Sequence, residues 1–366
     1  MRPPSRSILS GVVAVAVLMA GSAACTIKSS GASSGDRAQA PASGRSGTGT
    51  ADLTDGAGTK VALVPGGAHP YFQPWKAAGA AAKRQYGLGD VTFDETSEWD
   101  QQKQDNLVST LAARGYDAFG IFGVSPTDIN TTFADLKSQG FAVASLASCP
   151  AGGTDKADFC LSTDVEVAAY KAAKAAIGAM GGKGTLVHLT GNNVDANTQL
   201  SIRGVAEAVK ESGGKVKLLQ TITDVDKDLQ TAQKAVSDLL AAKGDRIQGI
   251  VTTAYNPAVA AADAVESSGF KAKVVAIDDD AKILGAIKDG SVAATVVQNP
   301  VGQAEVGTWA LALLETKQCA MRQPGRTIDS GSFVVTKANA GTYDSARKAK
   351  TEQLKKQFAD TYLVCK

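Results

Sequence analysis

A short apolar run followed by a longer alanine-rich amphipathic run recurs along the chain from residue 59 onward. Runs of β-branched or apolar residues cover positions 60–64, 91–93, 118–122, 142–146, 185–189, 216–221, 249–253, 274–277 and 293–297. Amphipathic stretches with apolar residues at three- and four-residue spacing lie between them, including 101–114, 165–180, 227–242 and 257–267. This alternation predicts an α/β fold in which parallel sheets carry helices on both faces.

The length of the repeating region predicts two lobes, because about 280 residues exceed what one hydrophobic core usually holds. We expect two doubly wound sheets joined by a three-segment hinge, with crossings near residues 163, 298 and 326. The N-terminal lobe would comprise residues 58–163 and 299–326, and the C-terminal lobe 164–298 and 327–336. Residues 337–366 would form a C-terminal helical extension with seven basic and three acidic residues. We interpret it as a solvated helix; the alternative is a basic face that touches lipid head groups or a permease.

The N-terminus has the pattern of an export signal. Arg2 and Arg6 precede an apolar stretch at residues 8–20, which is too short for a stable membrane span and ends in small residues before Cys25. This pattern is similar to a bacterial lipobox, so we predict a signal peptide over residues 1–24 and a lipid on Cys25. The alternative is ordinary cleavage that leaves Cys25 unmodified. Residues 25–57, rich in Ser, Gly, Ala and Thr, would form a flexible tether to the outer face of the cell membrane.

Four further cysteines follow Cys25, an even number that suits an oxidising compartment. We expect Cys149 to pair with Cys160 and Cys319 with Cys365. Zinc is the competing use for four cysteines, but no Cys-x-x-Cys or Cys/His spacing is present, so we expect no metal.

Charge and motif content disfavour several classes of protein. The whole chain has 38 basic and 36 acidic residues, and without residues 1–24 the two counts are equal, which gives no indication of a nucleic-acid partner. The two histidines are far apart, and neither a Gly-x-Ser-x-Gly elbow nor a phosphate-binding Gly-x-x-x-x-Gly-Lys loop occurs. We therefore expect no enzyme activity and no cofactor.

The loops at the carboxyl ends of the predicted strands form a candidate site, since ligands of open α/β sheets bind there. They read "PGGAHPYF", "FGVSPTD", "SLASCPAG", "TGNNVDANTQ", "TITDVDKD", "TTAYNP", "IDDDAK" and "VQNPVGQ". Together they offer aromatic faces, amides and hydroxyls, with few fixed charges apart from the aspartates. Such a site suits a small neutral polar ligand.

Over roughly residues 58 to 336 the sequence resembles periplasmic sugar-binding proteins of the ribose-binding type. The most specific matches are "HPYF" after the first strand, "VVAIDDD", and "ATVVQNPVGQAEVG". The resemblance implies that Tyr71 and Phe72 stack on a sugar, that Asp278 accepts hydrogen bonds from ring hydroxyls, and that Gln298 bonds near the hinge. It also implies a monomeric solute receptor that delivers a neutral sugar or polyol to an ABC importer. A receptor that presents its ligand to a membrane sensor kinase is the alternative.

The sequence departs from the family pattern where several sugar-binding side chains are expected. An Asp-Arg pair is replaced by Ala147 and Ser148, an arginine by Ser201, an aromatic residue by Val225 and an asparagine by Ala254. Polar neighbours in the same loops are candidates to replace the lost contacts: His69, Asn192, Gln199, Tyr255 and Asn256.

Several candidate residues also have purely structural interpretations. Tyr71 and Phe72 fit a role in capping the core of the first helix, and His69 fits an exposed loop. His188 fits the interior of a strand better than a ligand contact. Asp278, Asp279 and Asp280 compete to cap the following helix, and Gln298 fits a role in holding the hinge backbone.

Overall fold

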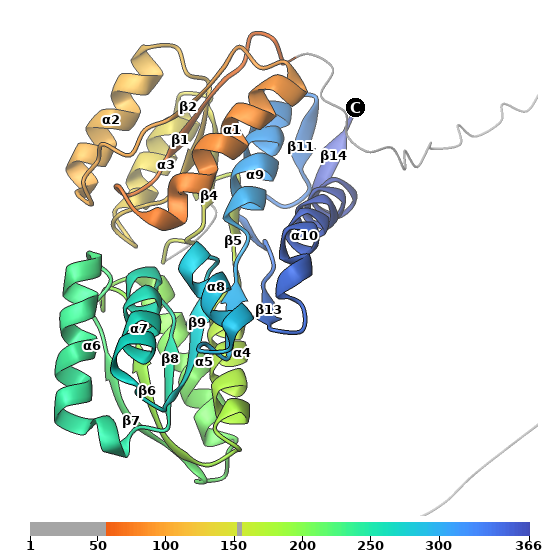
Figure 1. Ribbon diagram of the computed structural model, residues 1–366. Helices are drawn as coiled ribbons and strands as arrows, with labels where there is room; N and C mark the ends of the chain where they lie inside the picture. Colours follow the sequence, from red (N-terminus) through yellow and green to blue (C-terminus); the bar gives the residue numbers. More distant parts are fainter. Residues whose placement is uncertain (1–55, 152–155) are drawn as a thin grey trace, which may run out of the picture. The chain divides into compact units, whose positions relative to one another are not determined.

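The protein is described here by a computed structural model in which residues 56–151 and 156–366 are placed (Figure 1). These residues form two six-stranded sheets and one two-stranded sheet. The predicted signal peptide, Cys25 and all but the last two residues of the predicted tether lie outside the described residues. In the part of the chain that is described, no helix is long and apolar enough to cross a membrane.

The first lobe is built on a fully parallel sheet in the order β12-β5-β4-β3-β1-β2. Its strands are β1 (Lys60–Val64), β2 (Asp90–Phe93), β3 (Ala118–Ile121), β4 (Ala142–Leu146), β5 (Phe159–Ser162) and β12 (Arg326–Asp329). Helices α1 (Gln73–Tyr86) and α9 (Pro300–Glu315) cover one face, where Trp75 and Trp309 are buried. Helices α2 (Gln101–Ala113) and α3 (Ile129–Ser138) cover the other face around Phe133.

The second lobe repeats this arrangement in the order β13-β10-β9-β8-β6-β7. Its strands are β6 (Gly184–Leu189), β7 (Val216–Ile222), β8 (Gly249–Thr252), β9 (Lys273–Ile277), β10 (Ala294–Val297) and β13 (Phe333–Thr336), of which β13 is antiparallel to β10. Helices α4 (Val165–Ala179) and α5 (Ala196–Lys210) pack on one face. Helices α6 (Leu229–Lys243), α7 (Tyr255–Ser268) and α8 (Ala281–Asp289) pack on the other. The predicted doubly wound α/β fold with two lobes is confirmed.

Several helices begin at an acidic or amide side chain that caps the first turn. Asp164 accepts a hydrogen bond from Val167 N at the start of α4, and Asp228 accepts one from Thr231 N at the start of α6. Such caps satisfy N–H groups that have no partner within the helix. Because these caps lie where strands lead into helices, they place polar groups at the carboxyl end of each sheet.

The third crossing between the lobes lies later in the chain than predicted. The predicted first lobe ends at residue 326, but β12 pairs in parallel with β5 as far as Asp329, beside Ser162. Residues 327–329 therefore belong to the first lobe, and the chain crosses between Asp329 and Phe333. The short run "RTID" lacks the apolar pattern of a strand, and its position at the edge of the sheet allows alternate residues to face solvent.

Buried polar side chains join the three crossing segments. Gln303 Nε2 donates a hydrogen bond to Ser330 Oγ at 3.0 Å, and this oxygen lies 3.3 Å from Thr163 Oγ1. Asn299 Nδ2 donates to Ser330 O at 3.3 Å. Residues 163, 299 and 330 come from the first, second and third crossing, so this network links all three segments.

The C-terminal extension contacts both lobes and is not merely a solvated helix. Its helix α10 (Tyr343–Gln357) buries Tyr343 in the core of the second lobe and Leu354 in the core of the first. A short π-helix at Phe358–Tyr362 then buries Phe358 against Trp309 and leads into β14 (Leu363–Cys365). Figure 1 shows α10 beside α9 and next to the small sheet of β11 and β14. Its basic residues Lys348 and Lys356 are exposed, whereas Arg347, Lys350 and Lys355 are half-buried.

Two disulfides have the predicted pairing. Cys149 is bonded to Cys160, which joins the loop after β4 to β5. Cys319 in β11 (Cys319–Met321) is bonded to Cys365 in the antiparallel strand β14. The second bond ties the C-terminal extension to the segment that follows α9.

Candidate functional site

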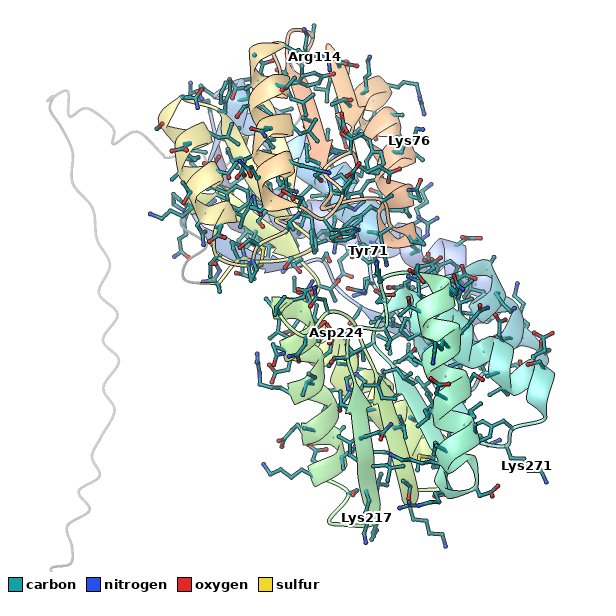
Figure 2. All side chains as sticks on the ribbon, turned by 90° about the vertical axis from the view of Figure 1, so that its left-hand side faces the viewer. Tyr71, Lys76, Arg114, Lys217, Asp224 and Lys271 are labelled. Atoms are coloured by element: carbon teal, nitrogen blue, oxygen red, sulfur yellow. A yellow bond between two sulfur atoms is a disulfide. The ribbon has the colours of Figure 1, made fainter. Side chains whose placement is uncertain are left out.

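A cavity of about 560 Å³ is lined by loops from both lobes at the carboxyl ends of their sheets. Figure 2 shows Tyr71 at the end of the first lobe remote from Arg114, and Asp224 at the end of the second lobe remote from Lys217. A volume of this size is typical of small-molecule sites. The predicted convergence of the strand-end loops is therefore present in the structure.

The loop after β1 forms a single 3-10 turn, Pro70–Phe72, that presents two rings. His69 caps this turn, with Nδ1 accepting a hydrogen bond from Tyr71 N at 3.2 Å. Tyr71 OH donates to Gln303 Oε1 at 2.8 Å, so the cavity wall is connected to the hinge network. Burial raises the pKa of Tyr71 well above its usual value, and the hydroxyl remains protonated. Phe72 is 2% exposed and packs on Trp75 and Phe122, so it belongs to the core as well as to the cavity lining.

Trp99 is a large exposed ring on the cavity wall, in the loop after β2. Its side chain is 44% exposed, with its centroid 6.1 Å from that of His69 and 6.0 Å from that of Phe122. The backbone there is left-handed, with φ of 59°, and its N–H donates to Gly66 O at 2.7 Å. A Cβ atom at Gly66 or Gly67 would lie 2.8 or 2.7 Å from the indole ring. The glycine pair before His69 therefore makes room for this ring.

Asp278 and Gln298 meet at the base of the cavity in the second lobe. Gln298 Nε2 donates a hydrogen bond to Asp278 Oδ1 at 2.9 Å, and Asp278 is only 4% exposed. Burial, with a further contribution from the charge of Asp279, raises the pKa of Asp278 to about 8. Asp278 does not cap α8, because Asp280 accepts the hydrogen bond from Lys282 N. Its carboxyl group is thus available to the cavity.

His69 also contacts the second lobe. Its Nε2 lies 3.3 Å from Asp226 Oδ2, and its ring centroid is 5.9 Å from that of Tyr255. Asn256 holds Asp226 in place through two hydrogen bonds, from its backbone N to Oδ1 at 2.7 Å and from Nδ2 to the backbone oxygen at 2.9 Å. The expectation of an exposed loop histidine is therefore wrong, since the His69 side chain is only 12% exposed and lies between loops of both lobes.

Most of the residues selected from sequence line the cavity. Seven of the nine candidate ligand-binding residues do so: His69, Tyr71, Phe72, Ser201, Tyr255, Asp278 and Gln298. Asn192, another candidate replacement, is also on the wall. The other two candidates are not among the lining residues. Asn256 is hydrogen-bonded to Asp226, and Gln199 donates a hydrogen bond to Asn193 O at 2.5 Å on the exposed side of α5. His188 is fully buried within β6, where its Nε2 is 2.7 Å from Thr253 Oγ1, and burial lowers its pKa to about 3.

Two important wall residues were not predicted. Trp99 lies in the loop after β2, which was left out of the set of strand-end loops although the strand itself was recognised. The sequence does not predict Asp226 as a site residue, because its contact with His69 involves the opposite lobe. The presence of only three tryptophans in the chain is a sequence signal that could have identified Trp99.

The described residues contain no group of three or more His, Cys, Asp and Glu side chains arranged to hold a metal ion. The cavity offers instead aromatic faces, hydroxyls, amides and carboxylates. This arrangement can enclose a small polyhydroxylated molecule by stacking and hydrogen bonding.

Comparison with known families identifies the chain. Residues 61–318 match the family model described as the periplasmic binding protein domain, which is well over half of the chain. The chain belongs to the periplasmic binding protein family. This is a family of extracytoplasmic solute receptors rather than a class of enzymes.

Solved structures with the same fold are numerous. A solute-binding protein of an ABC transporter from Burkholderia graminis, in complex with D-arabinose, has a TM-score of 0.71 and 23% identity, covering 80% of this chain and 99% of that chain. A periplasmic solute-binding protein from Actinobacillus succinogenes with bound D-allose has a TM-score of 0.71 and 20% identity, covering 78% and 100%. One from Bacillus halodurans with bound myo-inositol has a TM-score of 0.71 and 16% identity, covering 80% and 99%. At these identities the similarity establishes the fold.

Proposed function

We propose that this periplasmic binding protein captures a neutral sugar or polyol in its interlobe cavity and delivers it to an ABC importer. The observation that carries the proposal is the pairing of exposed or half-buried rings, at Trp99 and Tyr71, with the Asp278–Gln298 pair across the same cavity. Rings bind the C–H face of a sugar, and carboxylate and amide groups bind its hydroxyls. The bound sugars and inositol of the structural neighbours support this choice of ligand class.

A thermal-shift scan of the purified protein tests the ligand class. Sugars and polyols, alone among the compounds tested, should raise the melting temperature, with amino acids and carboxylates as controls of similar size. A ligand at a hundredfold excess over its dissociation constant adds about 2.7 kcal/mol to the free energy of unfolding. A shift produced only by carboxylate ligands would refute the proposal.

We further propose that the mature protein is a monomer held at the outer face of the cell membrane by a lipid on Cys25. The sequence pattern before Cys25 and the Ser- and Gly-rich segment after it support this. Mass spectrometry of the mature N-terminus should find a lipidated Cys25, and Cys25→Ser should move the protein from the membrane fraction to the soluble fraction. Retention of the Cys25→Ser protein in the membrane fraction would contradict the anchor.

Delivery to an importer is tested in the producing cell. Deletion of the protein should abolish uptake of the labelled sugar identified in the scan, and re-expression should restore it. Normal uptake with loss of a transcriptional response to the sugar would favour the sensor-kinase alternative.

A further inference from the structure

Acidic side chains outnumber basic ones around the cavity. Among the described residues, the lining carboxylates are Glu98, Asp195, Asp224, Asp226 and Asp278, whereas Lys227 is the only lysine and arginine is absent. Lys227 is an exposed side chain at the surface. The charged side chains around the cavity therefore favour a positively charged ligand.

The four aspartates of this set have no lysine or arginine partner among the described residues. Glu98 is paired with Lys103, but no lysine or arginine nitrogen of residues 56–151 and 156–366 lies within 4.0 Å of the carboxylates of the four aspartates. Asp226 has His69 at 3.3 Å, and Asp195 accepts a hydrogen bond from Asn197 N at 2.9 Å. Backbone and amide groups thus orient these carboxylates without neutralising them.

Asp278 is the most deeply buried of the four. Asp278 is only 4% exposed, and its side-chain hydrogen-bond partner is the neutral amide of Gln298. Ionising a carboxyl group in such a place is costly unless a positive charge lies beside it. Accordingly the pKa of about 8, raised by burial and then by Asp279, keeps this carboxyl group protonated at neutral pH while the cavity has no cation.

Aromatic faces on the same cavity add a second preference for positive charge. Trp99 presents an exposed indole, and the Tyr255 ring also lines the cavity, with the ring centroids of Trp99 and Tyr255 6.1 and 5.9 Å from that of His69. An ammonium group is attracted to the face of an aromatic ring and forms strong charge-assisted hydrogen bonds with carboxylates. A ligand with one ammonium group and several hydroxyls could therefore bind the carboxylates and aromatic faces through its ammonium group, and the other polar groups of the cavity through its hydroxyls.

We propose that the cavity, in addition to neutral sugars and polyols, takes their amine-substituted counterparts and binds them more tightly. The inference rests on the proposed function, because it concerns the same cavity and the same hydroxyl-binding groups. The ligand class is an amino sugar or aminocyclitol in its protonated form.

Calorimetric titration with matched sets of compounds tests the preference. One set is D-glucose, D-glucosamine and N-acetyl-D-glucosamine; the galactose series and scyllo-inositol with scyllo-inosamine provide the others. In the set whose hydroxyl configuration fits, the amine should bind about tenfold more tightly than the neutral sugar, since a charged hydrogen bond is roughly twice as strong as a neutral one. The N-acetyl compound has the nitrogen without its charge and should lose this advantage.

Proton release gives a second readout. Pairing with an ammonium group should ionise Asp278, so binding of the amine should release up to one proton, whereas binding of the neutral sugar should release none. Titrations in buffers with different ionisation enthalpies measure this release. Equal release for both compounds would contradict the role of Asp278.

Variants complete the test. Asp278→Asn and, independently, Asp226→Asn should reduce the amine-to-neutral affinity ratio by about tenfold, while Asp238→Asn, on the exposed side of α6, should leave the ratio unchanged. Equal affinity for amine and neutral sugar in the unmodified protein would overturn the inference and leave the proposed function intact. If no compound of either kind binds, the proposed function itself fails.

Discussion

At the scale of single residues, Trp99 shows how the backbone holds an exposed ring on the cavity wall. Glu98 and Trp99 both have left-handed backbone conformations, with φ of 54° and 59°. Such conformations are uncommon for residues with side chains and require support from their surroundings. Here the support is the hydrogen bond from Trp99 N to Gly66 O and the space left by two glycines. A ring held in this way is already oriented before a ligand arrives.

We therefore expect Trp99→Ala to weaken binding of the best sugar ligand about ten- to hundredfold, because a large stacking surface is lost. Trp99→Phe should retain most of the affinity. Trp75 and Trp309 are buried, so a change in tryptophan fluorescence on binding should come from Trp99 and disappear in both variants. Calorimetry and fluorescence titration measure the two effects, and unchanged affinity in Trp99→Ala would exclude Trp99 from the site.

Asp278 makes stability depend on pH. Between pH 3.8, its ordinary pKa, and about 8, the unfolded chain has lost the proton that the folded protein keeps. The free energy of unfolding therefore falls as pH rises through this window, as far as this group contributes. Asp278→Asn removes this pH dependence of stability. Asparagine also tolerates the left-handed backbone at this position, where φ is 63°.

We expect Asp278→Asn to be more stable than the unmodified protein by roughly 1 to 3 kcal/mol at pH 8 and equally stable near pH 4. Urea denaturation at a series of pH values in the absence of ligand measures the difference. Asp238→Asn provides the control for loss of an exposed carboxylate. A difference that is the same at pH 4 and pH 8 would show that Asp278 titrates normally.

At the scale of secondary-structure elements, α10 is a fourth connection between the lobes. Tyr343 at its start stacks on Phe333 of β13, with ring centroids 6.2 Å apart, and its hydroxyl donates a hydrogen bond to Asp279, next to Asp278. Thr351 in its middle donates to Asn299 in the hinge at 3.1 Å. Lys355 near its end lies over the rings of Tyr86 and Trp309 in the first lobe. The helix thus reaches from the cavity loop of the second lobe, past the hinge, to the core of the first.

Removal of the disulfide that ends this element should loosen it selectively. In Cys319→Ser with Cys365→Ser, we expect a loss of roughly 2 to 4 kcal/mol in the free energy of unfolding, since the bond closes a long loop. Hydrogen exchange should increase in β14 and α10 and stay unchanged in the second-lobe strands. Unchanged exchange in α10 would mean that the packing of Leu354 and Phe358 suffices to hold it.

At the scale of the whole molecule, the three crossings lie together and share one buried polar network. Short crossing segments allow rigid lobes to rotate, and the contact of His69 with Asp226 joins the two sides of the cavity directly. Tyr71 OH is hydrogen-bonded to Gln303, so the ligand loop and the hinge are mechanically linked. Ligand binding and lobe closure are expected to be coupled through these contacts.

Small-angle scattering should accordingly give a smaller radius of gyration at saturating ligand than without it. The enclosed ligand favours the closed arrangement because it contacts both lobes only there. A sugar that gives no thermal shift serves as the control. An unchanged radius at saturation would count against hinge closure.

Secondary structure was largely predictable because the central strands are buried on both faces and therefore appear as continuous apolar runs. The strands at 60–64 and 142–146 were predicted with the observed bounds, and most others within one residue. Five short strands lie outside the nine predicted runs: β5, β11, β12, β13 and β14. Each has only three or four residues, too few to show a periodic pattern, and its pairing depends on a strand elsewhere in the chain; β12 and β5, for example, are more than 150 residues apart.

The sequence by itself determined most of the loops that form the site, because parallel strands place all their carboxyl ends at one edge. Tyr71, Asp278 and Gln298 lie in loops that this rule selects, and the family resemblance identified them within those loops. The rule does not indicate which side chains of a loop turn inward or what they meet from the other lobe. Trp99 depends on two left-handed residues and the glycine pair, and Asp226 on its proximity to His69. These arrangements were decided only by the tertiary structure, because they depend on contacts between segments far apart in the chain rather than on local pattern.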